Sequence, residues 1–143
     1  MLAGEILTAP AISLRILVVD DNERVRHGVI SILASRTTWQ VCGEAKDGTE
    51  AVQKARELLP DVILLDISMP GLNGLETARL LRQHVANAKI LIMSQHDPVQ
   101  VLPGAIQAGA DGCVDKGHLG TELLSSIERI AGNSTPRGTV NPG

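Results

Sequence analysis

A chain of 143 residues is about one domain in length, because domains most often contain roughly 100–150 residues, and it is too short for a (β/α)₈ barrel of roughly 250. Apolar residues make up 43% and charged residues 20%, a globular composition that excludes a disordered chain. The 13 basic and 16 acidic residues give a net charge of −3, which argues against a standalone nucleic-acid binder. Trp39 is the only aromatic residue, so the core must be aliphatic and no base-stacking platform can form.

The ends of the chain differ from its middle. Residues 1–13 read as an N-terminal leader without periodicity, and residues 133–143, rich in Gly, Pro and Thr, read as a C-terminal linker or tail. No apolar run approaches the roughly 20 residues that a membrane span needs. Glu5 stands where a signal peptide would carry basic residues. We therefore expect a cytoplasmic protein that has no contact with a membrane.

Between these ends, short apolar runs alternate with segments whose apolar residues have helical spacing. The predicted strands cover residues 15–20, 40–44, 61–66, 89–94 and 112–114. The predicted helices run from 22 to about 36, from the turn at 47–48 to Pro60, from near Asn73 to Val85, from 98 to 108, and from about 120 to 131. Asn22 is a predicted N-cap, and Asn73 with Glu76 resembles a capping box.

The predicted helix over 98–108 contains an internal Pro103-Gly104 pair. Proline inside a helix costs about 3 kcal/mol. This helix is therefore expected either to start near Pro103 or to be weak, and Gly109 suits a left-handed cap at its end.

Five alternating strands and helices predict an α/β fold of the flavodoxin-like, doubly wound kind. We expect a five-stranded parallel sheet in the order 2-1-3-4-5, with helices on both faces. Cys42 and Cys113 then lie roughly 19 Å apart, at ~4.8 Å per strand spacing. A disulfide allows at most ~7 Å between Cα atoms, so both are expected to be free thiols.

Polar residues follow the strands at one edge of this sheet: Asp20, Asp21, Asp66, Ser94 and Lys116. Ligands of such folds bind beyond the carboxyl ends of the strands, where the strand order reverses. Three crowded carboxylates repel one another, so at least one pKa should rise unless a cation is present. Hard oxygen ligands suit Mg²⁺, and a carboxylate beside Mg²⁺ and a lysine is a reasonable nucleophile toward phosphorus. Each residue alone has an ordinary explanation as a cap, a turn or a surface charge, but the joint pattern favours a phosphoryl-transfer site.

Four motifs together resemble bacterial response-regulator receiver domains: Asp20-Asp21-Asn22, residues 64–74, residues 91–94 and residues 108–116. The resemblance covers about residues 14–132, the predicted receiver domain. The segments 41–45 and 94–97 resemble the NarL/LuxR-type branch, which carries a C-terminal helix-turn-helix. No such domain is present in this sequence, so the chain is either a single-domain regulator or a receiver cut from a longer protein, and the linker-like tail favours the latter.

The resemblance implies a phosphoacceptor and a metal site. Asp66 would accept the phosphoryl group. Asp21, Asp66 and the backbone carbonyl of Ser68 would bind Mg²⁺ directly, and Asp20 would act through water.

It also implies residues that contact or influence the phosphoryl group. Ser94 and Lys116 would contact its oxygens. Ser68 and His96 would occupy the two variable positions that influence how fast the group is lost.

Three residues depart from the family pattern. Gln95 stands where a small residue is usual and could crowd the phosphoryl group. Cys113 replaces an aromatic residue of the switch, and Gly117 replaces a proline that is often cis.

The resulting hypothesis is a signalling domain rather than an enzyme, with only self-catalysed phosphotransfer and dephosphorylation. A sensor histidine kinase would phosphorylate Asp66, and the change would reach a face formed by residues 98–108, 112–114 and 120–131. A homodimer is possible, and DNA would be contacted only through an output domain outside this sequence, as in a transcription regulator. The alternatives are a degenerate receiver that only binds protein, and an Mg²⁺-dependent phosphatase with an Asp nucleophile. The phosphatase pattern places an acid two residues after the nucleophile, where this chain has Ser68.

Overall fold

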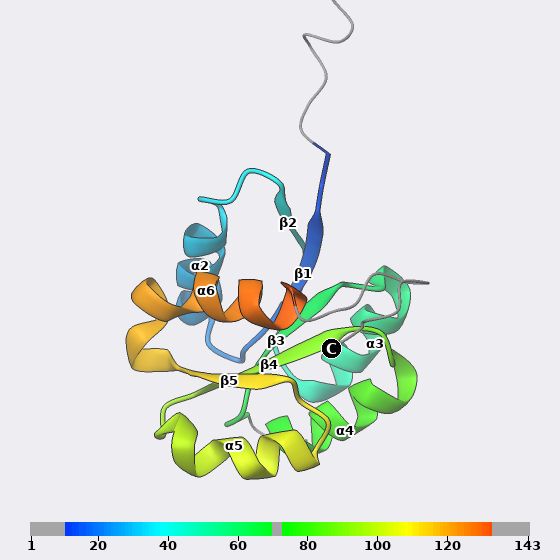
Figure 1. Cartoon of the computed structure of the whole chain (residues 1–143). Coiled ribbons are helices and arrows are strands. Elements are labelled where there is room, and N and C mark those ends of the chain that lie inside the picture. Colours follow the sequence, from blue (N-terminus) through cyan, green and yellow to red (C-terminus); the bar gives the residue numbers. More distant parts are fainter. Residues whose placement is uncertain (1–10, 70–72, 133–143) are drawn as a thin grey trace, which may run out of the picture.

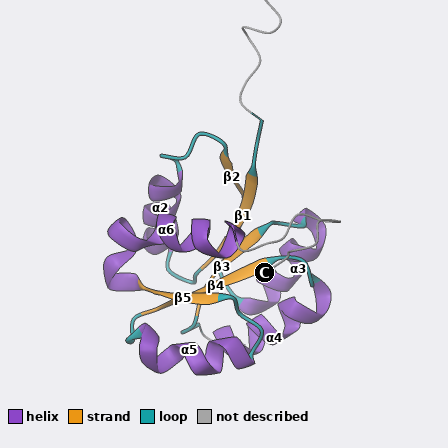
Figure 2. Cartoon of the chain, in the orientation of Figure 1, coloured by secondary structure: helices purple, strands orange, loops and turns teal. Residues whose placement is uncertain are grey.

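A computed structural model of the chain describes residues 11–69 and 73–132. Most of the predicted leader and all of the predicted tail lie outside these residues. In the described part, strands and helices alternate (Figures 1 and 2). The elements are β1 (Leu14–Val19), α2 (Glu23–Leu33), β2 (Trp39–Ala45), α3 (Gly48–Leu58), β3 (Val62–Asp66), α4 (Gly74–His84), β4 (Lys89–Ser94), α5 (Pro98–Gln107), β5 (Gly112–Asp115), the short 3₁₀ helix η1 (Lys116–His118) and α6 (Leu119–Gly132).

The strands form one sheet in the order β2-β1-β3-β4-β5, and all four pairings are parallel. This confirms the predicted fold class and strand order. β3 is buried along its whole length, as expected for a parallel strand that helices cover on both faces. The carboxyl ends of β1 and β3 are therefore neighbours at the centre of the sheet.

Alternate residues of the strands point to opposite faces of the sheet and form two separate cores. Ile63 and Leu65 pack on the side of α3, α4 and α5. Val62 and Leu64 pack on the side of α2 and α6. Figure 1 shows the sheet between these two layers of helices. Both cores are built almost entirely from aliphatic side chains, as the composition predicts.

Side-chain caps fix where the helices begin. The side chain of Asn22 accepts a hydrogen bond from the Val25 N–H, and that of Asn73 accepts one from the Glu76 N–H. Both predicted N-caps are confirmed.

The structure confirms the predicted helix over 98–108, and of the two alternatives for α5 a start near Pro103 is wrong. Asp97 caps the helix through the Val99 N–H at 2.9 Å, Pro98 occupies the first turn, and the helix continues through Pro103. A proline at the start of a helix adds a favourable φ and loses no bond, which offsets part of the cost of Pro103. Gly109, with φ of 99°, ends the helix in the left-handed region as predicted.

Cys42 and Cys113 are free, in agreement with their predicted separation. Among the described helices, none combines the length and the apolar character needed to cross a membrane.

Candidate functional site: an acidic cluster at the carboxyl edge of the sheet

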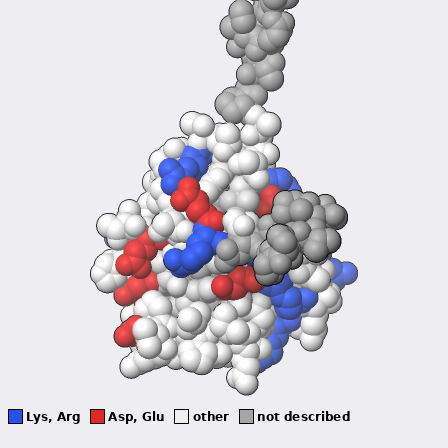
Figure 3. Space-filling model, viewed as in Figure 1, with Lys and Arg blue, Asp and Glu red and all other residues white. Residues whose placement is uncertain are grey.

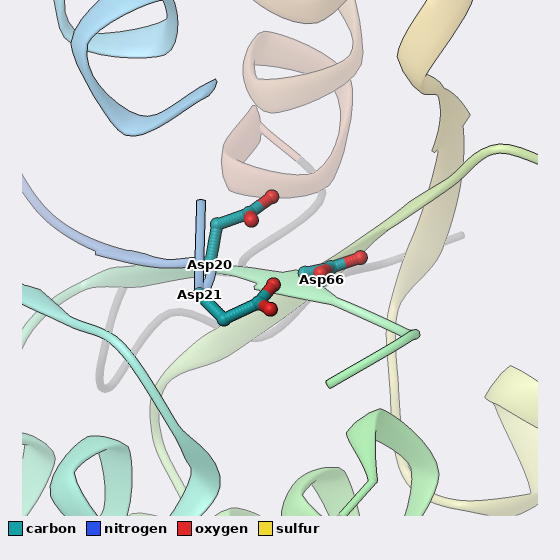
Figure 4. Close-up of side chains that lie close together, drawn as sticks. All are labelled: Asp20, Asp21 and Asp66. Atoms are coloured by element: carbon teal, nitrogen blue, oxygen red, sulfur yellow. The ribbon is translucent and has the colours of Figure 1, made fainter. Parts of the chain in front are cut away.

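Three carboxylates meet where β1 and β3 end. Asp20 and Asp21 directly follow β1, and Asp66 is the last residue of β3. One oxygen from each of the three lies within 4.8 Å of those of the other two, and Figure 4 shows the three side chains side by side. Asp20 and Asp66 are buried, with 0% and 2% exposure, while Asp21 is exposed. The predicted gathering of these side chains is therefore present in the fold.

Lys116 reaches this cluster from the end of β5. Its Nζ lies 2.7 Å from Asp20 Oδ2 and 3.1 Å from Asp66 Oδ1. Burial alone would lower the pKa of Lys116, but the attraction of the two carboxylates outweighs it and raises that pKa. The ammonium therefore stays charged at neutral pH and partly offsets the negative charge of the cluster.

The pKa of Asp66 is raised, first because burial removes the carboxylate from water and further because of the charge of Asp20. The Ser68 N–H, 3.2 Å from Asp66 Oδ1, and Lys116 oppose this shift. The sequence predicts a raised pKa from repulsion among carboxylates. The direction agrees, but the largest cause is burial.

The donor set fits a hard divalent cation. Asp20 Oδ2 is buried, and no described donor is aligned with it for a hydrogen bond, although the Lys116 ammonium lies close enough for an ion pair. This one ammonium offsets only part of the charge of three adjacent carboxylates, so a further cation would stabilise the cluster. Asp20, Asp21 and Asp66 together offer the oxygen ligands that Mg²⁺ prefers.

The other predicted site residues lie around this cluster. Ser94 ends β4, is fully buried, and stands opposite Asp115 in the sheet. Its Oγ accepts a hydrogen bond from the His96 N–H at 2.9 Å. Gln95 is exposed and lines a groove together with Lys116.

Cys113 does not join the cluster. It lies opposite Ile92 in the β4–β5 pair and packs against the core on the side of α3, α4 and α5. Its contacts are with the hydrophobic core, on the sheet face that α5 covers.

Two further residues near the site, Gly74 and Arg26, could not be recognised as site residues from the sequence. A Cβ on Gly74 would lie 2.4 Å from Ile67 Cα and 2.6 Å from the carbonyl oxygen of Asp66, so only glycine lets α4 begin beside Asp66. Arg26 donates to the Asp20 carbonyl. A glycine at a helix start and an arginine within a helix are common in any sequence, and neither carries a signal that points to these contacts.

Comparison with known proteins gives the class to which this fold and site belong. The family described as "Response regulator receiver domain" matches residues 16–128. Response regulator GacA of Pseudomonas viridiflava is 42% identical over 120 residues, which is 82% of this chain and 55% of the relative. Response regulator UvrY of Escherichia coli K12 is 38% identical over 117 residues, which is 82% of this chain and 54% of the relative.

Solved structures agree with these relatives. A LuxR-family two-component response regulator from Aurantimonas sp. SI85-9A1 superposes with a TM-score of 0.79 at 37% identity, covering 83% of this chain and 85% of that chain. The signal receiver domain of a NarL response regulator from Mycobacterium tuberculosis gives 0.79 at 34% identity, covering 87% and 100%.

The chain belongs to the response regulator receiver domain family. Its similarity to LuxR-family and NarL proteins confirms the NarL/LuxR-type branch. It spans about half the length of the curated relatives it matches.

Proposed function

We propose that this chain is a phosphoacceptor domain in which Asp66 takes a phosphoryl group and thereby switches a signalling output. One observation carries the proposal. Asp66 is a buried carboxylate that lies 3.1 Å from a lysine ammonium and shares a cluster with two further carboxylates. A nucleophile so placed meets positive charge on the side where a phosphoryl group gains negative charge.

The transfer needs little more than alignment. An oxygen of the Asp66 carboxylate attacks phosphorus, the bond from phosphorus to the donor's nitrogen or oxygen breaks, and an acyl phosphate forms. The electron pair of the broken bond leaves with the donor. Lys116 offsets the charge of the phosphoryl oxygens, and the hydroxyl of Ser94 donates a hydrogen bond to one of them.

Asp21, Asp66 and the Ser68 carbonyl would hold Mg²⁺, with Asp20 acting through water. A bound Mg²⁺ supplies further positive charge for the phosphoryl oxygens. Ser68 and His96 would be the two positions whose side chains influence how long the group survives, and Gln95, directly after Ser94, would crowd it.

A sensor histidine kinase is the proposed donor, which places the chain in the cytoplasm. A groove of about 520 Å³ opens beside Lys116 and is lined by Val25, Gly28 and Ile32 of α2. Because Lys116 belongs to both the groove and the site, the donor's protein surface would contact the groove while presenting its phosphohistidine. Output would pass through a domain outside the described residues, such as a DNA-binding domain of a transcription regulator, and could involve a homodimer.

Acetyl phosphate with Mg²⁺ tests the assignment without a kinase. Intact-mass measurement should show one added phosphoryl group in the native chain and none in Asp66→Asn. Asp47→Asn is the matched control, because Asn also caps helices and Asp47 caps α3. Labelling that persists in Asp66→Asn would sink the assignment. A native chain that takes no label would favour a degenerate receiver, and turnover of a generic phosphate ester would favour a phosphatase.

A further inference from the structure

We propose that Arg26 is a positioning residue of the acidic site, which holds the peptide between Asp20 and Asp21 in place. This inference rests on the proposed function. Arg26 Nη1 donates to the carbonyl oxygen of Asp20 at 2.7 Å. Its Nε donates to Glu44 Oε1 at 2.9 Å. One guanidinium therefore connects α2 with the ends of β1 and β2.

Arg26 binds the chain just beyond β1, where the hydrogen bonding of the sheet ends. The Asp20 N–H still donates to the Ala45 carbonyl of β2 at 3.0 Å. The Asp20 carbonyl lies one step beyond the end of β1, and the guanidinium of Arg26 is its donor. Asp20 Oδ1 also accepts from the Asn22 N–H at 2.9 Å. Asp20 is thus held through its amide, its carbonyl and its side chain.

Asp21 depends on this arrangement more than Asp20 does. Asp21 is exposed, and no described residue donates a hydrogen bond to its carboxylate. The carbonyl that Arg26 binds belongs to the peptide that joins Asp20 to Asp21. Fixing that peptide fixes the direction of the Asp21 side chain, so an exposed carboxylate becomes a ligand that is already in place when a cation arrives.

The pair with Glu44 orients the guanidinium. The Arg26 side chain is only 16% exposed, and the Glu44 carboxylate holds its Nε edge while Nη1 points to Asp20. A planar guanidinium can serve both partners in one fixed geometry, whereas a lysine ammonium on a flexible stem cannot. Lysine at this position should therefore replace the charge but only part of the positioning.

A purely structural tie between α2 and β2 is the competing explanation. α2 is already anchored by Val29 and Leu33, which are buried in the core. Arg36 offers a matched comparison, because it pairs with Glu128 at 2.9 Å and lies over Trp39, and neither partner belongs to the acidic cluster. If Arg26 only tied elements together, both arginines would affect stability alone.

Isothermal titration with Mg²⁺ separates these explanations, since it reads cation affinity and not phosphorylation. Arg26→Gln should weaken Mg²⁺ binding about 10-fold, the low end of the range for groups that orient metal ligands. Arg26→Lys should recover only part of this loss, and Arg36→Gln should leave the affinity unchanged. Melting temperatures without Mg²⁺ establish that each variant is folded.

A folded Arg26→Gln chain with native Mg²⁺ affinity would overturn the inference. If that variant fails to fold, Mg²⁺ titration of Glu44→Gln tests the inference instead. This variant keeps Arg26 but removes the carboxylate that orients the guanidinium. It should weaken Mg²⁺ binding several-fold, and an unchanged affinity would again refute the positioning role. A native chain that binds no Mg²⁺ would contradict the proposed metal site itself, which is a different result.

Discussion

Gly28 and Gly74 both lie in helices but have opposite surroundings. A Cβ on Gly28, in the middle of α2, would meet no atom within 4 Å, whereas a Cβ on Gly74 would collide with the backbone of Asp66 and Ile67. Gly28→Ala should raise the free energy of unfolding by about 0.5–1 kcal/mol, because alanine favours the helix and glycine does not. Gly74→Ala should lower it by about 2 kcal/mol or more, since the colliding atoms belong to the main chain.

Urea unfolding of the two variants measures both effects. Gly74→Ala should also lose phosphoryl acceptance, because α4 must move away from Asp66. A Gly74→Ala chain of native stability would contradict the role assigned to this glycine, and a destabilised Gly28→Ala chain would contradict the open surroundings of Gly28.

Some residues of the site can be predicted from the sequence, and others cannot. Asp20, Asp66 and Lys116 could be predicted because each follows an apolar strand, and parallel strands bring their carboxyl ends to one edge. The position of Arg26 could not, because its partner is a backbone carbonyl and every residue has one. Gly74 could not be predicted either, because the atoms that exclude a Cβ there belong to the main chain of Asp66 and Ile67, eight and seven residues earlier.

At the scale of elements, α5 differs from every other helix of the described chain. It carries no charged residue, and Figure 3 shows the uncharged surface over it. Val99 and Ile106 are 77% and 52% exposed. Pro103 lies inside it and removes one backbone donor. From these features we expect α5 to be less stable than the other described helices and easier to rearrange.

We therefore expect phosphorylation to act by reordering α5, since Cys113 has no ring to move between two pockets. With beryllofluoride as the phosphoryl mimic, hydrogen exchange should change across residues 98–108. Cys113→Ala should keep this response, and Pro103→Ala should reduce exchange in α5 even without the mimic, because it restores a helix donor. Changes confined to another surface would refute the hypothesis.

The order and type of the elements could be predicted, because hydrophobic periodicity and caps are local. The start of α5 was harder to predict, because three local effects compete there. The cost of Pro103 argues for a later start, while the Asp97 cap and Pro98 favour the observed one. Such competition is settled by packing against β4 and β5, which no short window of sequence contains.

For the whole molecule, we expect the acidic cluster to make the stability of the fold depend on divalent cations. Mg²⁺ should raise the melting temperature by a few degrees, because it binds only the folded arrangement of carboxylates. Asp21→Ala should abolish this gain. An equal gain in Asp21→Ala, measured by differential scanning calorimetry, would show that the ion binds elsewhere.

The same cluster sets a pH dependence in Mg²⁺-free buffer. Burial raises the pKa of Asp66 in the folded chain, so the folded state holds this proton more tightly than the unfolded state does. The contribution of Asp66 to stability therefore falls as pH rises from its unfolded pKa through its folded pKa. Asp66→Asn should be more stable than the native chain at pH 7 by about 1 kcal/mol, and a less stable variant would contradict this sign. Urea midpoints with a chelator present, compared with those of Asp47→Asn, measure the difference.

The two thiols have a practical consequence for spectroscopy. Burial and the nearby Asp115 raise the pKa of Cys113 to about 11, and burial raises the pKa of Cys42. Only the thiolate reacts with maleimide or iodoacetamide dyes, and at pH 7 roughly one Cys113 in 10,000 is in that form. A cysteine introduced at an exposed position such as Gln107 would therefore react first. Trp39 is the single intrinsic fluorophore. Energy transfer from Trp39 to a dye on the introduced cysteine would therefore report one distance, without removal of the native cysteines.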